Sequence, residues 1–67
     1  MNLGANICKA RKDAHLTQAD LAEKLHVSFQ AVSCWEREQS VPDTYNFIEL
    51  SKVLNVSLDW LVHNRVN

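Results

Sequence analysis

The stretch from Thr17 to Arg37 reads T-Q-A-D-L-A-E-K-L-H-V-S-F-Q-A-V-S-C-W-E-R and predicts two short helices joined by a tight turn. Thr17 can cap the first helix because its hydroxyl accepts hydrogen bonds from the free N–H groups of the first turn. Asp20 lies three residues later and can complete a capping box, and Ser28 is a second N-cap. Apolar residues then mark one face of each helix: Leu21, Ala22 and Leu25 in the first, Val32 and Trp35 in the second.

Further helices are predicted on both sides of this pair. One covers about residues 3–13, and Gly4 inside it weakens it by about 1 kcal/mol relative to alanine. Another begins after an N-cap at Asp43 or Thr44 and runs to about residue 54, and Ser57 caps a last short helix. The central pair is a helix-turn-helix motif. The predicted fold class is therefore all-α, a compact bundle of about five short helices.

The length of 67 residues allows one domain, which we expect to span residues 1–67 with its core at about 3–62 and a frayed tail at 63–67. A chain this short buries only about 60% of the surface that its unfolded form exposes, so its stability should be modest. No signal peptide or apolar run of membrane length is present, and Cys8 and Cys34 match no disulfide or zinc pattern. We therefore expect a cytoplasmic protein with reduced thiols and no metal site.

The formal net charge of −1 is unusual for a protein that binds nucleic acid, where a basic surplus is typical. Positive charge gathers at Lys9, Arg11 and Lys12, and the second motif helix has no lysine or arginine between Ser28 and Glu36. No convergent carboxylate pair or nucleophile–base set is present, so we expect no catalytic residues and no enzyme activity.

Four segments of the sequence, in order, carry a resemblance to a known family: Leu16-Thr17-Gln18-Ala19-Asp20-Leu21-Ala22, Val32-Ser33-x-Trp35-Glu36-Arg37, Val41-Pro42-Asp43 and Leu54-Asn55-Val56-Ser57-Leu58-Asp59-Trp60-Leu61. Over about residues 3–62 the chain resembles the phage repressor and Cro family of helix-turn-helix DNA-binding proteins. The resemblance implies a lambda-repressor-like domain of a transcriptional regulator, repressor-like, that binds double-stranded operator DNA as a homodimer. It implies no cofactor, no membrane and no small-molecule ligand.

The second motif helix, about Ser28–Glu36, would then read the major groove. A helix advances about 100° per residue, so with Val32 and Trp35 inward one set of side chains points outward: Phe29, Gln30, Ser33, Cys34 and Arg37. The resemblance places base-reading residues at Phe29, Gln30 and Cys34. Gln30 can pair with adenine N6 and N7, and Phe29 can press on a thymine methyl.

Phosphate contacts are expected from polar residues on either side of that helix. These are Gln18, Arg37, Gln39 and Ser40, together with the free N–H groups at the start of the first motif helix.

Other interpretations of the same residues remain open. Gln30 can be an ordinary exposed glutamine, and Phe29 can fold back over the turn or face a protein partner. Cys34 can be an inert surface thiol or a redox sensor. The uncharged helix face and the negative net charge favour the alternative function, a protein-binding module of the same fold that acts as an antirepressor or regulates a partner protein.

The resemblance also pairs Arg11 with Glu36 as a structural ion pair, whereas the alternative leaves both as solvated surface charges. The family commonly has glycine at four connection positions, which here hold His15, His26, Glu38 and Asn55. Such positions usually need positive φ, which glycine adopts freely. We therefore interpret the histidines as turn residues, in preference to metal ligands or pH sensors.

Overall fold

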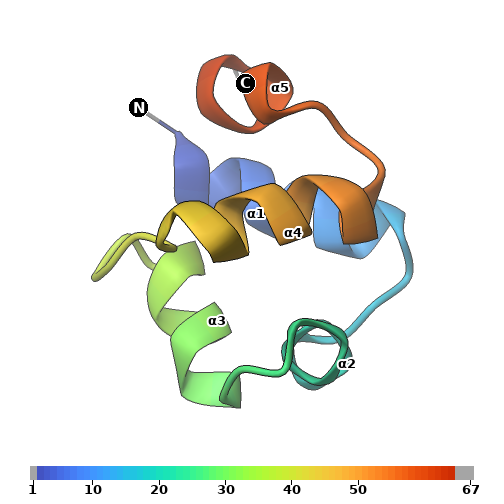
Figure 1. Cartoon of the computed structure of the whole chain (residues 1–67), viewed down its shortest axis with the longest axis vertical. Helices are drawn as coiled ribbons and strands as arrows, with labels where there is room; N and C mark the ends of the chain where they lie inside the picture. The colour runs from blue at the N-terminus through green and yellow to red at the C-terminus, as the bar shows by residue number, and fades with distance from the viewer. Residues whose placement is uncertain (1, 65–67) are drawn as a thin grey trace.

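Five helices and their short connections make up residues 2–64, the part of the chain that the computed structural model describes. In chain order they are α1 (Leu3–Asp13), α2 (Gln18–Leu25), α3 (Phe29–Glu36), α4 (Thr44–Leu54) and α5 (Leu58–His63). Figure 1 shows α2 and α3 at one end of the molecule, α1 and α4 across the middle and α5 at the other end. The prediction of an all-α bundle with a helix-turn-helix motif is confirmed.

Most helices begin at a residue whose side chain caps them. Thr17 and Asp20 form the predicted capping box, with the Asp20 N–H donating to Thr17 Oγ1 at 3.0 Å and the Thr17 N–H donating to Asp20 Oδ2 at 3.0 Å. The side chains of Ser28, Asp43 and Ser57 cap α3, α4 and α5 by each accepting a hydrogen bond from the N–H three residues later. These local hydrogen bonds explain why the predicted helix starts agree with the observed ones.

The ends of α1 to α4 share one geometry. In each, a residue in the left-handed conformation follows the helix, and two N–H groups fold back onto carbonyls of the last turn. The four left-handed residues are His15 (φ 61°), His26 (φ 58°), Glu38 (φ 59°) and Asn55 (φ 57°). The four positive-φ positions expected from the sequence are thus confirmed, although none of them is glycine.

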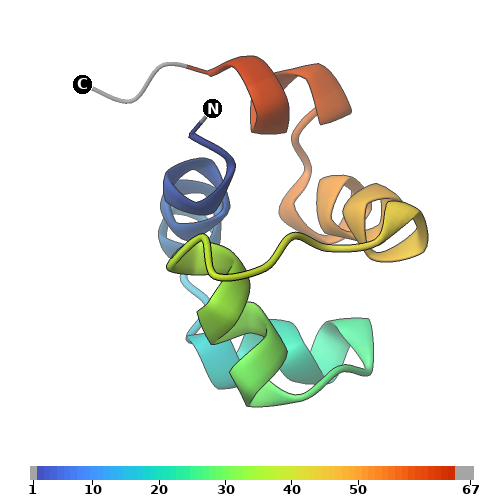
Figure 2. The same cartoon turned by 90° about the vertical axis from the view of Figure 1, so that its left-hand side faces the viewer.

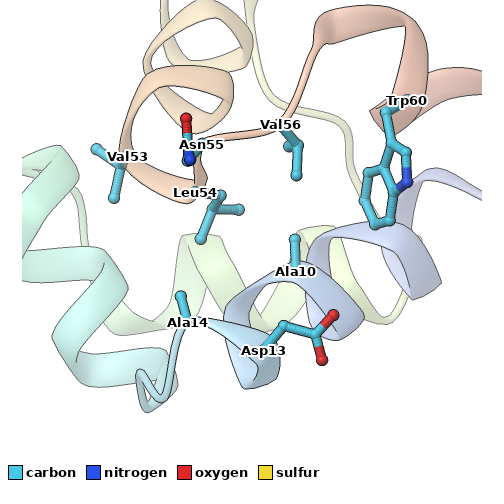
Figure 3. Close-up of a pocket in the computed structure, with 8 residues that line it drawn as sticks. All are labelled: Ala10, Asp13, Ala14, Val53, Leu54, Asn55, Val56 and Trp60. Atoms are coloured by element: carbon cyan, nitrogen blue, oxygen red, sulfur yellow. The ribbon is translucent and has the colours of Figure 1, made fainter.

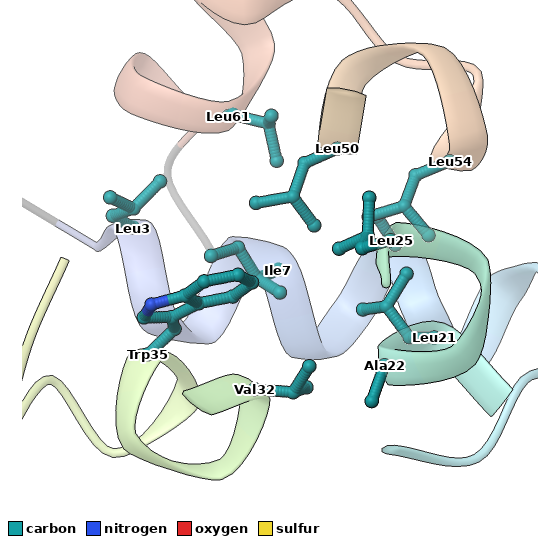
Figure 4. Packing of buried hydrophobic residues seen from close by; sticks show 11 residues of the cluster. Leu3, Ile7, Leu21, Ala22, Leu25, Val32, Trp35, Leu50, Leu54 and Leu61 are labelled. Carbon is teal, nitrogen blue, oxygen red and sulfur yellow. The ribbon is translucent and has the colours of Figure 1, made fainter. Parts of the chain in front are cut away.

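One side chain from every helix is fully buried at the centre of the molecule (Figure 4): Ile7, Leu21, Val32, Leu50 and Leu61. Trp35 closes the core beside α1, and Leu3, Ala10, Ala22, Leu25 and Leu54 complete it. Each fully buried valine, leucine or isoleucine side chain contributes about 1.5–3 kcal/mol. Because Val32 and Trp35 both point inward, the core fixes the rotation of α3 about its axis and so decides which residues of α3 face outward.

The C-terminal boundary lies slightly later than predicted. His63 is still the last residue of α5, and Asn64 is held by the buried Asn6, whose Nδ2 donates to the Asn64 carbonyl at 3.0 Å and to the Leu61 carbonyl at 2.7 Å. The expected frayed tail therefore does not begin at residue 63, and its remaining residues, 65–67, lie outside the described part of the chain. Within residues 2–64, no helix combines the length and apolar character needed to cross a membrane.

Gly4 has a packing role that the sequence did not indicate. It is buried where the first turn of α1 meets the last turn of α3, and a Cβ atom on it would lie 2.6 Å from the Glu36 carbonyl oxygen and 2.7 Å from the Trp35 carbonyl oxygen. Both obstacles are backbone atoms, so they cannot rotate away. Glycine lowers the helix propensity of α1, but it permits this close approach of two helices.

We expect Gly4→Ala to destabilise the domain by about 1–3 kcal/mol, the cost typical of an overpacked site. Helix propensity alone predicts the opposite, a gain of about 1 kcal/mol. Urea unfolding followed by circular dichroism would decide between them. Ala5→Gly, at the exposed neighbouring position, is the matched control and should lose only about 1 kcal/mol. A more stable Gly4→Ala variant would show that α1 and α3 do not meet closely there.

Candidate nucleic-acid interface

The outward face of α3 begins at its N-terminal turn. Phe29 is 53% exposed although it is a large apolar side chain, and Gln30 beside it is exposed. Arg37, directly after the helix, is also exposed. Ser33 and Cys34 are half-buried, so the prediction that they point fully outward is only partly right. They follow Val32 by one and two residues, which places them on either side of the middle of the outward face.

The end of α3 and the connection after it form one continuous polar surface. Arg37 Nε donates to the Ser33 carbonyl at 3.3 Å, and its Nη2 lies 3.9 Å from Cys34 Sγ. The Cys34 thiol donates to Gln39 Oε1 at 3.7 Å. These contacts are weak, but they bring together four residues that the sequence assigned to the interface. Ser40 follows them as an exposed residue.

Gln18, the first residue of α2, makes a contact with α3 that the sequence did not predict. Its Nε2 donates to Glu36 Oε1 at 3.0 Å, so the side chain bridges α2 to the end of α3. The amide carries two N–H bonds, and the second is available to an anion. The Thr17–Asp20 capping box satisfies two N–H groups of this turn, which leaves those of Gln18 and Ala19 without a partner in the described residues.

Arg11 and Glu36 form the ion pair expected from the resemblance. Arg11 Nε lies 2.7 Å from Glu36 Oε2 and Nη2 lies 3.1 Å from Oε1, which makes the contact bidentate. Arg11 Nη1 also donates to the Leu16 carbonyl at 2.8 Å. The two side chains are only 11% and 6% exposed, so the interpretation as solvated surface charges is wrong. Cys8 is half-buried, with its Sγ 3.6 Å from Arg11 Nη2.

Both members of this pair stay charged near neutral pH. Burial raises the pKa of the Glu36 carboxyl, but hydrogen bonds from Arg11 and Gln18 outweigh burial and hold this pKa below its ordinary value. The hydrogen bond to Glu36 in turn raises the pKa of Arg11. The pair thus keeps one charge of each sign behind the outward face of α3, and neither is free for a ligand.

Other basic side chains are also partly neutralised. Lys9 Nζ lies 2.9 Å from Asp13 Oδ2, and Lys52 Nζ lies 3.3 Å from Glu49 Oε2. Arg37 is therefore the positive charge placed directly at the end of α3. The surface can bind a polyanion mainly through amides, hydroxyls and backbone N–H groups.

A hollow lies elsewhere, between α1 and the connection from α4 to α5. It measures about 400 Å³ and is open to solvent. Figure 3 shows Leu54 and Trp60 facing Ala10 and Ala14 across it. Asp13 is the one ionisable residue in its lining, so it offers no acid–base pair. Trp60 is half-buried and packs against the core.

The fold and this surface define a helix-turn-helix domain whose second motif helix is presented to solvent. A family profile described as helix-turn-helix matches residues 9–61, and the chain belongs to that family.

Two sequence relatives support this family membership. The chain is 40% identical over 62 residues to the HTH-type transcriptional regulator ImmR of Bacillus subtilis (strain 168), covering 92% of this chain and 49% of ImmR. It is 38% identical over 60 residues to repressor protein C2 of Salmonella phage P22, covering 90% of this chain and 28% of that repressor. The chain thus spans half or less of the length of these relatives.

Structural comparison supports the same family membership. The crystal structure of the P22 c2 repressor in complex with a synthetic operator superposes with a TM-score of 0.90 at 35% identity, covering 97% of this chain and 98% of that one. The resemblance to phage repressors that the sequence indicated is confirmed.

A double-mutant cycle should show that Arg11 and Glu36 act as a unit. We expect Arg11→Ala and Glu36→Ala each to lower stability strongly, because either change leaves a buried charge without its partner. The double variant should lose less than the sum, with a coupling energy of about 0.5–3 kcal/mol in urea unfolding.

The exposed pair Lys9–Asp13 serves as the matched control for this cycle. It is also a salt bridge, but its side chains are 48% and 65% exposed. Its coupling energy should be only about 0.3–0.5 kcal/mol. Additive effects of the Arg11 and Glu36 substitutions would mean that the two charges do not interact in solution.

Proposed function

We propose that this chain is a sequence-specific, DNA-binding transcriptional regulator of the repressor-like kind, which reads the major groove of operator DNA with α3. The observation that carries the proposal is the outward face of α3, with Gln30 and Phe29 at its start, on a fold that superposes on an operator-bound phage repressor. A helix with exposed side chains at its N-terminal end is the part of a helix-turn-helix that contacts base edges.

The exposed residues of α3 have distinct roles in this proposal. Gln30 donates and accepts a pair of hydrogen bonds at adenine N6 and N7, and Phe29 contacts a thymine methyl. Cys34 supplies a small, weakly polar contact, and Ser33 adds a hydrogen bond of low selectivity. Because Ser33 and Cys34 are half-buried, we assign most of the discrimination between sequences to the first turn of α3.

Phosphate groups on either side of the groove would fix the position of the domain. Arg37, Gln39 and Ser40 contact one stretch of backbone, and the second N–H of Gln18 with the free N–H groups of α2 contacts another. Two copies of the chain would bind together as a homodimer, with their recognition helices in successive major grooves about 34 Å apart. The place of action would be the cytoplasm, and neither a cofactor nor a small-molecule ligand is required.

A second candidate function is a protein-binding module of the same fold. The observation in its favour is Phe29, which is 53% exposed on a helix without a lysine or arginine. An apolar ring on an uncharged face suits a protein partner as well as a thymine methyl. Selection of binding sites from a random duplex library at low salt separates the two functions, because only a DNA reader enriches one sequence.

On the selected operator, Gln30→Ala should weaken binding by about 1–3 kcal/mol, the value typical of one bidentate base contact. Fluorescence anisotropy with labelled operator would measure this. The fold should be unaffected because Gln30 is exposed. Binding to an unrelated duplex is the internal control and should not change. A folded variant with unchanged operator affinity would exclude Gln30 from base reading, and a library with no enriched sequence would favour the protein-binding module.

The salt dependence of binding should be shallow. Each phosphate neutralised by a cation contributes about −0.9 to the slope of log affinity against log salt concentration. With Arg37 and one or both of the exposed Lys9 and Lys12 of α1 making such contacts in each subunit, we expect a slope of about −4 to −5 for the dimer on its selected operator. A slope near −8, measured by anisotropy across a series of salt concentrations, would show that charged contacts dominate the interface instead.

A further inference from the structure

The start of α1 differs from the starts of the other helices. Asn2, at its N-cap position, makes no side-chain capping hydrogen bond. Instead, the N–H of Gly4 in the first turn donates to Oε1 of Glu38 at 2.9 Å. Glu38 is 34 residues away in sequence and lies in the connection between α3 and α4. The carboxylate of another segment therefore caps this helix.

Glu38 occupies a backbone position that does not favour glutamate. Its φ of 59° is left-handed, the Glu38 N–H donates to the Trp35 carbonyl at 3.1 Å, and the Gln39 N–H donates to the Cys34 carbonyl at 2.9 Å. Glycine is usual in this arrangement, and asparagine is the common exception. The glutamate side chain offers something that glycine lacks: a negative charge placed at the positive end of the α1 dipole.

This cap connects α1 to the segment that carries phosphate donors. Glu38 stands between Arg37 and Gln39, and Ser40 follows, all of them exposed. Figure 2 shows the connection leaving α3 beside the first turn of α1 and then crossing to α4. The hydrogen bond to Gly4 and the close approach of Gly4 to the last carbonyls of α3 hold the segment from the side of α1.

We propose that Glu38 is a positioning residue for DNA binding. Its carboxylate fixes the segment 37–40 against α1, so that the phosphate donors of this segment have their bound geometry before DNA arrives. Preorganisation of this kind raises affinity because less conformational freedom is lost on binding. This inference rests on the proposed function of DNA binding.

Charge repulsion alone predicts that loss of the Glu38 side chain strengthens DNA binding, whereas the positioning role predicts that it weakens binding. The direction of the change in affinity therefore tests the proposal. A negative charge next to phosphate donors repels DNA, so its removal should strengthen binding. Under the positioning role, removal of the side-chain oxygen that accepts from the Gly4 N–H frees the segment and weakens binding. Glu38→Gln removes the charge but keeps an Oε1 acceptor for the Gly4 N–H, whereas Glu38→Ala removes both. Alanine also has a Cβ atom, so the left-handed backbone strain stays the same as in the wild type.

The experiment compares the affinity of the wild type and both variants for the selected operator, at a temperature where circular dichroism shows all three to be folded. We expect Glu38→Gln to bind as tightly as the wild type or more tightly. Glu38→Ala should bind about 2- to 12-fold more weakly than Glu38→Gln, the effect of one hydrogen bond. Equal affinities of the two variants would overturn the proposal.

A second readout needs no DNA. Gly4 is the only glycine of the chain, so selective ¹⁵N-glycine labelling gives a single backbone amide signal. Its hydrogen exchange should be slow in the wild type and in Glu38→Gln, and faster in Glu38→Ala. Fast exchange of the Gly4 amide in the wild type would show that the Gly4–Glu38 hydrogen bond does not form in solution.

The two readouts separate failure of the inference from failure of the proposed function. A protected Gly4 amide together with equal affinities of the variants would remove only the positioning role of Glu38. A wild type that selects no DNA sequence would remove the proposed function, and with it the role of Glu38 in DNA binding.

Discussion

The Arg11–Glu36 ion pair is the contact on which the arrangement of the helix-turn-helix motif depends. It joins α1 to the last residue of α3, and through the Leu16 carbonyl and Gln18 it also holds the start of α2. Burying two charges costs several kcal/mol of desolvation, which their mutual attraction offsets only when the remaining hydrogen-bonding groups are also satisfied. Here Gln18 and the Leu16 carbonyl satisfy them. The network therefore favours one relative placement of three helices more than it adds to stability.

That placement determines what α3 can present to a partner. The core requires Val32 and Trp35 to face inward, and the ion pair holds the C-terminal end of α3 against α1. Phe29 and Gln30 in the N-terminal turn of α3, and Arg37 directly after the helix, remain exposed. Gly4 lets α1 approach the carbonyls of α3 more closely than any other residue would. A rigid α3 with few exposed residues follows from these constraints.

The sequence predicted those features that depend on local interactions. Thr17, Ser28 and Ser57 mark helix starts through contacts within one turn, so the helix boundaries could be predicted well. The left-handed positions and the Arg11–Glu36 pair came from the family resemblance. The hydrogen bonds from Gln18 to Glu36 and from Gly4 to Glu38 were missed because they join residues 18 and 34 positions apart. Their geometry exists only after the helices pack, and the single glycine of the chain was the one available signal for the second.

The charge distribution limits how such a surface can act on DNA. The chain has a net charge of −1 and Arg37 as the cation at the end of α3, so its long-range attraction to the duplex is weak. Amides, hydroxyls and backbone N–H groups act only at contact distance and only in the right orientation. Hydrogen bonds to base edges carry sequence information, whereas contacts to phosphate charges do not. Under the proposed function, a domain with this surface binds DNA with little general electrostatic attraction and depends on accurate placement of neutral donors. The contacts of Glu36 and Glu38 with α1 hold the end of α3 and the segment after it, where Gln39 and Ser40 lie.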